Sequence, residues 1–540
     1  MPAVPVAAEA TSRTATSPSL RYDAGVAQLV VDGRLYLVRG GEVHNSAAST
    51  PEAARSSFAA AAAVGVNTVL APVPWDAFEP VEGQFDPAVV DMLVAAAREA
   101  GLRLILLWFG AYKNGASSYA PAWVKTDPDR FPRCLDEEGA RTGTLSPFSA
   151  ATREADAHAF AAMVQRVEEI DAQDRTVLMV QVENEPGLLG HSRDHDPHAE
   201  ELFAAAPPAD VLEAAGITAP QPGWTSAFGD GLDADEHFMA WGFATYIDAV
   251  ARAGRAHTTL PFFTNTWLDS EIDLPGSALA GGQRPGTYPS GGPVAGMLPL
   301  WRALAPHLDL IVPDIYFGDF SEICATYGAA SDGLFIPEMR RDAQGVGDAF
   351  VAVGQHGAIG VSPFGIDSIT EPEATHLRDG FELLAAVDPD LHPGHERRGF
   401  HIPPSTDSDA HVDLRFGGVR LRATRLVPFG EVAAPAQGAF GVVIRLSATR
   451  FLAAGRGFTL TFHDPAGVRQ IGLLSVLEHP RSPSHDDGER PVLRRLNGDE
   501  TAGGTAWFHP ALAQQQSEVF PIPMSLQHSG VSTCEVYWLD

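Results

Sequence analysis

The chain has 540 residues, of which 45% are hydrophobic and 19% are charged. This apolar fraction is typical of a packed protein and excludes wholesale disorder and collagen-like structure. The 68 acidic and 37 basic residues give a net charge of −31. Because such a field repels phosphate backbones and anionic lipid surfaces, we expect neither nucleic acid nor a membrane as a partner.

Cysteine content and the N-terminus indicate the compartment. Cys134, Cys324 and Cys534 are widely separated and fit neither a disulfide framework nor a zinc-binding spacing. Residues 1–20 lack the charged start and apolar run of a secretory signal. No apolar stretch approaches the ~20 residues of a membrane span. We expect a cytoplasmic protein with a disordered tail over residues 1–24.

Short apolar runs alternate with longer helical patterns between residues 25 and 391. The run 102–109 is almost wholly apolar, as in strands of parallel sheets that are buried on both faces. Helices are predicted where apolar residues recur at helical spacing, as in 150–173. The eight predicted strands are 34–43, 67–75, 102–109, 177–185, 261–267, 308–316, 334–339 and 357–365.

Eight strand–helix pairs predict an α/β fold, namely a (β/α)8 TIM barrel over residues 25–391 with long inserted loops. An open, doubly wound sheet is the competing architecture. That fold usually carries a glycine-rich phosphate-binding turn after its first strand, and R-G-G-E-V-H-N at 39–45 is not such a turn. The barrel is therefore the preferred prediction.

The pattern changes beyond residue 391. Residues 392–410 are polar and rich in proline, and we interpret them as a linker. Residues 411–540 alternate polar and apolar residues with period two in short runs separated by turn residues, which predicts an all-β sandwich-like domain. The clearest runs are 411–416, 419–424 and 458–463.

Two glutamates stand where a barrel enzyme carries its active site, at the carboxyl ends of strands. Glu185 ends the fourth predicted strand and Glu338 ends the seventh. A single glutamate at a strand end is usually a solvated loop residue, but two in this arrangement favour catalysis. Two carboxylates ~5–5.5 Å apart cleave a glycosidic bond with retention, one as acid and the other as nucleophile. Tyr316 would hydrogen-bond the nucleophile and keep it ionised.

Aromatic residues at or just past strand ends would provide a platform for the apolar face of a sugar ring. We predict this role for Trp75, Tyr112, Trp267 and Tyr316. Trp108 is equally compatible with a place in the core.

Histidines cluster in the loop after the fourth strand, at His191, His195 and His198. Metal ligation is one interpretation, but a polar loop run of this kind is more often exposed to solvent. We expect no metal and no cofactor, since two carboxylates suffice for the chemistry.

Several motifs resemble known glycoside hydrolases. Q-V-E-N-E-P-G at 181–187 and F-I-P-E-M at 335–339 resemble the retaining enzymes of clan A. Further segments resemble the bacterial β-galactosidases of family 35, which are similar also to family 42 and carry an additional C-terminal β domain. These are G-G-E-V-H-N-S at 40–46, P-W-D-A-F-E-P-V-E-G-Q-F-D at 74–86, L-W-F-G-A-Y-K-N-G at 107–115 and Y-P-S-G-G-P-V at 288–294.

The resemblance implies roles for individual residues. Glu185 takes the acid/base role and Glu338 the nucleophile role, while Asn184 bonds the sugar 2-hydroxyl. Glu183 and Glu42 would bind other sugar hydroxyls.

One departure from the family concerns the residues after the nucleophile. The family 35 enzymes have an aromatic residue there, whereas Met339, Arg340 and Arg341 follow in this chain. The two arginines would either act on the neighbouring carboxylate or pair with acidic surface groups.

Together these observations predict a retaining exo-β-glycosidase, a β-galactosidase acting on terminal non-reducing galactose of a small or oligosaccharide substrate. The long loops after the fourth and fifth strands favour a walled pocket. Two alternatives stay open, namely another clan A specificity (β-glucosidase, β-mannosidase or galactanase-like) and a non-catalytic sugar-binding barrel. The sequence also leaves open the oligomeric state and the role of the C-terminal domain.

Overall fold

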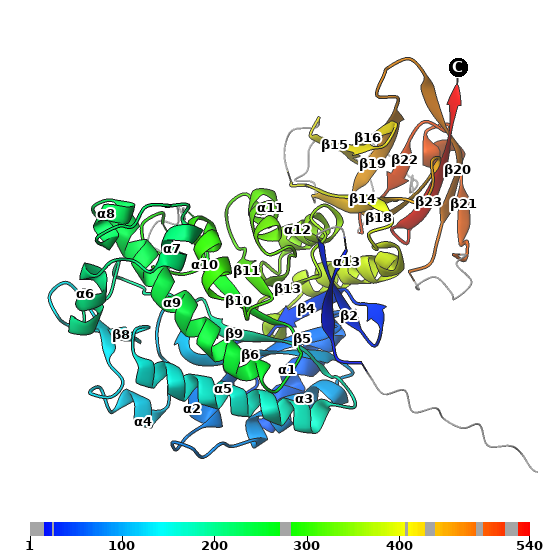
Figure 1. The fold of residues 1–540 in the computed structure, drawn as a ribbon. Coiled ribbons are helices and arrows are strands. Elements are labelled where there is room, and N and C mark those ends of the chain that lie inside the picture. The colour runs from blue at the N-terminus through cyan, green and yellow to red at the C-terminus, as the bar shows by residue number, and fades with distance from the viewer. Residues whose placement is uncertain are drawn as a thin grey trace, which may run out of the picture.

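Parallel strands close into a barrel in the computed structural model, which describes residues 16–23, 26–270, 282–404, 409–426, 438–481, 490–512 and 528–539 (Figure 1). The sheet has eight strands in the order β11-β10-β9-β6-β5-β4-β13-β12. A parallel bridge between Ile315 and Met339 joins its two edges. The strands are β4 Val38–Glu42, β5 Thr68–Pro74, β6 Arg103–Lys113, β9 Val177–Asn184, β10 Phe262–Trp267, β11 Leu310–Asp314, β12 Ile336–Met339 and β13 Gly360–Pro363. All eight predicted barrel strands and the barrel itself are confirmed.

Helices surround the barrel (Figure 1). The principal ones are α1 Pro51–Ala63, α3 Ala88–Glu99, α5 Ala150–Asp171, α9 Leu232–Arg255, α10 Leu298–Leu304, α11 Phe320–Ala330, α12 Ala343–Gly354 and α13 Glu373–Val387. Shorter elements are α2 Trp75–Phe78, α4 Ala122–Lys125, η1 Ala295–Met297, η2 Ile366–Ser368, η3 Asp388–Asp390 and the hairpin β7 Arg133–Leu135 and β8 Arg141–Leu145.

The long segment after the fourth strand is more ordered than its composition indicates. It contains the short helices α6 Pro197–Ala204, α7 Ala209–Ala214 and α8 Trp224–Phe228. Asp196 caps the first of them by accepting a hydrogen bond from the His198 N–H. Trp224 is buried against Phe238 of α9, so tertiary packing holds the segment against the barrel.

A small antiparallel sheet closes the amino-terminal end of the barrel. It consists of β1 Ser19–Asp23, β2 Val26–Val31 and β3 Arg34–Leu35. The prediction of a disordered tail is therefore wrong for residues 19–23, while residues 1–15 and 24 lie outside the described residues. β1 is mostly exposed, and it forms because its backbone pairs with β2, from Ser19–Val30 to Asp23–Val26. Its own sequence carries little hydrophobic signal.

The C-terminal part is a sandwich of two antiparallel sheets, as predicted. One sheet contains β14 Glu396–Ile402, β17 Ala439–Arg445, β18 Arg450–Arg456, β23 Val531–Leu539, β20 Gln470–Glu478 and β21 Arg494–Leu496. The other contains β15 His411–Phe416, β16 Val419–Arg425, β19 Phe458–His463 and β22 Trp507–His509, with η4 Gly498–Thr501 nearby in sequence. The core between them includes Phe400, Leu414, Phe451, Leu460 and Trp507.

The boundary of this domain differs from the prediction. The segment 392–410 is not simply a linker, because β14 lies within it and pairs with β17 over seven residues, from Glu396–Arg445 to Ile402–Ala439. The charged residues Glu396, Arg397 and Arg398 concealed this strand. The sandwich therefore begins near residue 396 rather than 411.

The sandwich packs against helices α12 and α13 of the barrel (Figure 1). Phe350 of α12 meets Phe440 of β17, with ring centroids 4.9 Å apart. Asp379 of α13, 5% exposed, accepts hydrogen bonds from Arg456 at 2.9 and 3.0 Å and also pairs with Arg481. An apolar contact and a buried ion pair thus fix the domain on one side of the barrel.

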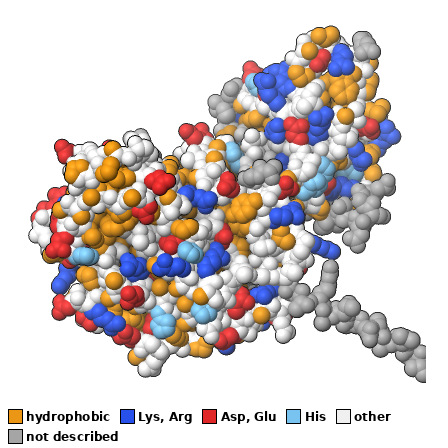
Figure 2. Space-filling view, in the orientation of Figure 1, with side chains coloured by type: hydrophobic (Ala, Val, Ile, Leu, Met, Phe, Trp, Pro, Cys, Tyr) orange, Lys and Arg blue, Asp and Glu red, His pale blue; other side chains and the backbone are white. Residues whose placement is uncertain are grey.

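The surface carries both signs of charge. On the face shown in Figure 2, acidic and basic side chains are interspersed. The ion pairs of the described residues include Arg98–Asp171 at 2.6 Å and Arg166–Asp91 at 2.7 Å. Among the helices of the described ranges, none combines the length and apolar composition needed to cross a bilayer.

Candidate active site

Eight side chains meet at the carboxyl end of the barrel, and we call them the mouth cluster. They come from the ends of β4, β6, β9, β10, β11 and β12 or the residues just after them. All but Tyr316, which is partly exposed, are more than nine-tenths buried, and Glu185 and Glu338 keep 7% and 6% of their surface exposed. The members are Glu42, Lys113, Asn184, Glu185, Asn265, Asp314, Tyr316 and Glu338.

Both carboxylate oxygens of Glu338 receive a hydrogen bond. Asn184 Nδ2 donates to Oε1 at 3.3 Å and Tyr316 Oη donates to Oε2 at 2.9 Å. The Tyr316 contact was predicted from the sequence, whereas the Asn184 contact with Glu338 was not. Two donors fix the orientation of the Glu338 carboxylate, which a nucleophile requires.

Glu185 lies in a different environment. Its backbone N–H donates to Asn265 Oδ1 at 2.9 Å, and Asn265 Nδ2 donates to Asp314 Oδ2 at 2.7 Å. The Asp314 and Glu185 carboxyls are themselves hydrogen-bonded. Burial, reinforced by the charge of Glu338, raises the pKa of Glu185 to about 7. Glu185 can therefore hold a proton near neutral pH, as a general acid must.

Lys113 is the cation of the mouth cluster. Its Nζ donates to Asn184 Oδ1 at 2.8 Å and lies 4.7 Å from the centroid of the Phe109 ring. Burial alone would lower the pKa of Lys113, but the surrounding carboxylates, Glu338 foremost, outweigh it and raise the pKa. The ammonium stays charged and orients the Asn184 amide so that its Nδ2 faces Glu338.

Glu42 is 1% exposed, and neither of its carboxyl oxygens has a hydrogen-bond partner among the described residues. Burial and the charge of Glu338 raise the pKa of Glu42 well above its usual range. A buried polar group without partners is costly unless a ligand satisfies it. This geometry agrees with the predicted contact between Glu42 and sugar hydroxyls.

The aromatic predictions divide into two groups. Trp267 at the end of β10 and Tyr316 just after β11 are partly exposed at the mouth. Trp75 and Tyr112 are fully buried, so the prediction that they form a sugar platform is wrong.

The buried pair packs in the core instead. Trp75 Nε1 donates to Glu79 Oε2 at 2.8 Å. The Tyr112 ring stands edge-on to Phe243 and Tyr246, with centroid distances of 4.9 and 5.0 Å. A position after a strand end does not determine whether a side chain turns inward or toward the surrounding helices.

Glu183 also differs from its predicted role. It is fully buried and accepts hydrogen bonds from the backbone N–H groups of Ala111 at 3.2 Å and Tyr112 at 2.6 Å. Its carboxyl is hydrogen-bonded to Asp156 of α5. Glu183 therefore faces the helix layer, not the sugar, because its left-handed backbone (φ 61°) breaks the alternation of the strand.

His195 and the two arginines that follow Met339 have structural partners. His195 Nδ1 lies 2.7 Å from Glu200 Oε1, and no group of three His, Cys, Asp or Glu residues within the described part of the chain is placed to hold a metal ion. Arg340 pairs with Asp342 and Arg341 with Glu373, which agrees with the interpretation that they pair with acidic groups.

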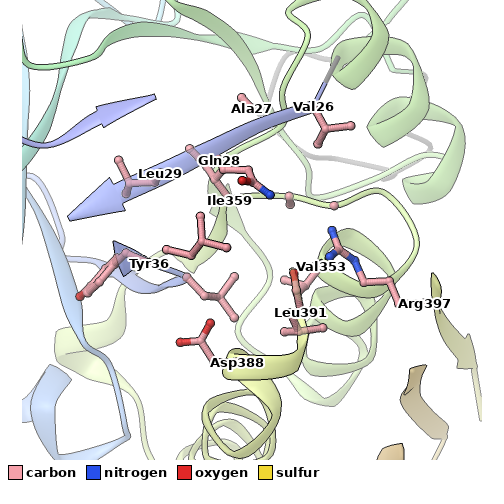
Figure 3. Close-up of a pocket in the computed structure, with 14 residues that line it drawn as sticks. Val26, Ala27, Gln28, Leu29, Tyr36, Val353, Ile359, Asp388, Leu391 and Arg397 are labelled. Atoms are coloured by element: carbon pink, nitrogen blue, oxygen red, sulfur yellow. Dashed lines mark hydrogen bonds between the residues drawn. The ribbon is translucent and has the colours of Figure 1, made fainter. Parts of the chain in front are cut away.

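A cavity at the opposite end of the barrel does not suit a sugar. It lies between β2 and the segment around Asp388 and Arg397 (Figure 3). Its volume is about 60 Å³, well below the ~300–1,000 Å³ of small-molecule sites, and apolar side chains such as Leu29, Val353 and Leu391 line much of it.

Sequence reasoning did not assign three members of the mouth cluster, namely Lys113, Asn265 and Asp314. Asn265 and Asp314 lie within predicted strands, and Lys113 follows the predicted strand 102–109. Their positions near strand ends were a usable signal. The hydrogen bonds that tie them to Asn184 and Glu185 appear only when the barrel closes.

Three comparisons place the chain among known proteins. Residues 28–215 match the model of glycosyl hydrolases family 35, and residues 377–507 match a domain of unknown function. No curated protein matches the sequence.

Solved structures that resemble the chain include three glycosidases. The catalytic domain of a β-amylase from Paenibacillus polymyxa has 12% identity and a TM-score of 0.44, over 62% of this chain and 94% of that one. A cold-adapted β-galactosidase from Rahnella sp. R3 has 17% identity and a TM-score of 0.46, over 66% of this chain. A β-galactosidase from the psychrophilic Marinomonas ef1 has 14% identity and a TM-score of 0.46, over 65% of this chain. The aligned part spans 57% and 60% of the two β-galactosidases.

These structural scores are too low to assign a site, so the assignment rests on the residues of the chain and on the family match. The matched range contains Glu42, Asn184 and Glu185 but not Glu338. The barrel, its two mouth glutamates and the match over residues 28–215 together indicate a glycoside hydrolase, and the part of the chain over residues 28–215 resembles glycosyl hydrolases family 35.

Proposed function

We propose that the protein is a retaining exo-β-glycosidase that hydrolyses terminal, non-reducing β-D-galactose by double displacement. One observation carries this proposal. Glu185 and Glu338 share one buried mouth but differ in environment, since Glu338 receives two hydrogen bonds and Glu185 has a pKa raised to about 7. When two neighbouring carboxyls have such different environments, the one with the raised pKa serves as the acid and the other as the nucleophile.

In the first step Glu338 attacks the anomeric carbon. The carbon–oxygen bond to the leaving group breaks while Glu185 transfers its proton to that oxygen, and a covalent glycosyl-enzyme forms on Glu338. Asn184, held by Lys113 and close to Glu338, would donate to the sugar 2-hydroxyl. That interaction strengthens as the oxocarbenium-like transition state develops.

In the second step water replaces the leaving group. Glu185, now ionised, takes a proton from the water as it attacks the anomeric carbon, and the bond to Glu338 breaks. Two inversions restore the β configuration. The Glu185 proton is regained, so the enzyme ends the cycle in its starting state.

Galactose is the proposed sugar because residues 28–215 match the family 35 model and the motifs there resemble family 35 β-galactosidases. Glu42, with no hydrogen-bond partner among the described residues, would accept from one or two sugar hydroxyls. The partly exposed ring of Trp267 would stack on the apolar face of the sugar.

The test is proton NMR of an aryl β-galactoside during the first minutes of hydrolysis. β-Galactose appearing before mutarotation supports the sugar and the retaining mechanism. α-Galactose appearing first means inversion and removes the nucleophile role from Glu338. If the corresponding β-glucoside or β-mannoside is cleaved and the galactoside is not, the sugar assignment is wrong while the mechanism stands.

A further inference from the structure

Two buried carboxyls lie directly behind the strand end that carries Asn184 and Glu185. Asp156 of α5 and Glu183 of β9 are fully buried and hydrogen-bonded to each other. Both carboxyls accept from the same Ala111 N–H, and two buried carboxyls this close favour the state in which they share one proton. Burial raises the pKa of both groups, which keeps that proton in place. The mechanism proposed above does not use this pair.

The negative charge is surrounded by donors. Trp108 Nε1 donates to Asp156 Oδ1 at 2.8 Å, and Tyr246 Oη donates to Asp156 Oδ2 at 2.9 Å. The Ala111 N–H is shared at 3.2 Å between Asp156 Oδ2 and Glu183 Oε1. A buried polar network whose members are all satisfied is rigid, so this pair can serve as an anchor.

The anchor lies where the barrel sheet is interrupted. Pairing between β6 and β9 runs to Trp108–Val182 and resumes only at Lys113–Asn184. Four residues of β6 therefore face one residue of β9, Glu183. The Glu183 and Asp156 carboxyls accept the Ala111 and Tyr112 N–H groups in this gap, in place of the missing ladder.

Local backbone conformation adapts to the anchor. The positive φ of Glu183, 61°, turns its side chain outward, and Glu185 has a φ of 44°. A Cβ on Gly110 would collide with Trp108 Nε1, Glu183 Oε1 and Asp156 Oδ1. Only glycine fits there, so the backbone of β6 lies directly against the carboxyl pair.

The residues on either side of the gap belong to the active site. Lys113 ends β6, and Asn184 and Glu185 follow Glu183. We infer that the Asp156–Glu183 pair positions Glu185 and the Lys113–Asn184 contact, by fixing the two interrupted strand ends relative to each other. The pair touches no substrate and acts through its neighbours. The inference rests on the proposed function, because it assigns its effect to the acid Glu185.

The experiment compares two leaving groups in Asp156→Asn. Trp108 donates to one oxygen of Asp156, and Tyr246 and Ala111 donate to the other, so the N–H₂ group of the amide faces a donor at either position. The anchor is therefore disrupted while the side-chain volume is kept. Methyl β-galactoside needs a proton from Glu185 on its leaving oxygen, whereas 2,4-dinitrophenyl β-galactoside does not. We expect the ratio of kcat/KM for the methyl to the dinitrophenyl substrate to fall about 10- to 100-fold.

A role in folding alone predicts a different result. A smaller folded fraction lowers both kcat/KM values equally, so an unchanged ratio in Asp156→Asn overturns the inference. Glu185→Gln provides the reference for a full loss of the acid. Tyr246→Phe removes one hydroxyl donor and should lower the kcat/KM ratio about two- to fivefold. This variant keeps the test possible if Asp156→Asn does not fold. An unchanged ratio in Tyr246→Phe also counts against the inference.

The matched control is Tyr36→Phe. This variant also removes a partly buried tyrosine hydroxyl, whose Oη lies 2.9 Å from Thr68 Oγ1 at the opposite end of the barrel. The kcat/KM ratio of the two substrates in Tyr36→Phe should equal that of the wild type. If the wild type cleaves no β-galactoside, the sugar assignment fails, and the two leaving groups are compared on the glycoside that it does cleave. If Glu185→Gln shows the selective loss and neither anchor variant does, the inference fails while the proposed function stands.

Discussion

The two ends of the barrel differ although the same strands build both. At the base, inward side chains are apolar and pack against β2, so this end is a hydrophobic core. At the mouth, a few residues further along, the same strands end in the mouth cluster. The apolar set includes Leu70, Ile105, Leu178, Phe263 and Leu310, with Ala27, Leu29 and Val31 of β2.

The comparison shows that stability and chemistry are separated along each strand. Burial of the base contributes about 25 cal/mol per Å² of apolar surface. At the mouth, burial disfavours charge and raises the pKa of Glu42, Glu185 and Asp314. Carboxyls held in this way lower stability and are tolerated because packing elsewhere offsets them. Substitutions at the two ends should therefore have opposite effects.

The largest expected effect is on activity at the mouth. Glu338→Gln removes the nucleophile and should lower kcat at least about a thousandfold. Because one of several crowded carboxylates becomes neutral, the Tm should stay the same or rise. Steady-state kinetics and calorimetry measure both quantities, with exposed Glu52→Gln as the matched control. A Tm several degrees lower in Glu338→Gln would contradict the comparison.

The next effect is on stability at the base. Leu178 of β9 is fully buried in the apolar set, and Leu178→Ala should lower the free energy of unfolding by about 2–5 kcal/mol through the cavity it leaves. The kcat of the folded enzyme should change little, since Leu178 lies seven residues before Glu185. Urea unfolding checks the first value, with Val468→Ala, 82% exposed in the wild type, as control. A large loss of kcat below the unfolding transition would contradict the separation of the two ends.

The smallest effect concerns pH. Glu185 must be protonated to act as the acid, so kcat/KM should fall as the pH rises through its pKa of about 7. The charge of Lys113 lowers that pKa, so Lys113→Met should move the basic limb of the profile to higher pH. The pH dependence of kcat/KM measures the shift, with exposed Lys125→Met as control. If the basic limb of the pH profile stays in place or moves to lower pH, Lys113 does not lower the pKa of Glu185.

Much of the barrel and the core of the site followed from the sequence. Apolar runs at regular spacing predicted the eight strands, and polar residues at their ends predicted Asn184, Glu185 and Glu338. This works because a parallel strand buried on both faces needs apolar residues along its length. At the end of the strand apolar residues are no longer required, so polar residues can stand there.

Strands that are stabilised mainly by pairing with a neighbouring strand could not be predicted from apolar runs. β1 and β14 are exposed or charged along much of their length, and both form through pairing with a neighbouring strand. Their hydrogen bonds join backbone groups, which every sequence possesses. Only the presence of the partner strand decides that such a segment becomes a strand.

Side-chain direction at the strand ends was likewise decided by the tertiary structure. Glu183 and Asn184 are neighbours, yet Glu183 faces Asp156 and Asn184 faces Glu338. Alternation along a strand holds only while φ stays in the β region, and the left-handed backbone of Glu183 ends it. The sequence by itself determined where the strands end and placed Asn184, Glu185 and Glu338 at the mouth of the barrel. The closed barrel and its helix layer decided which way each one turns, because the partners that stabilise each direction come from distant parts of the chain.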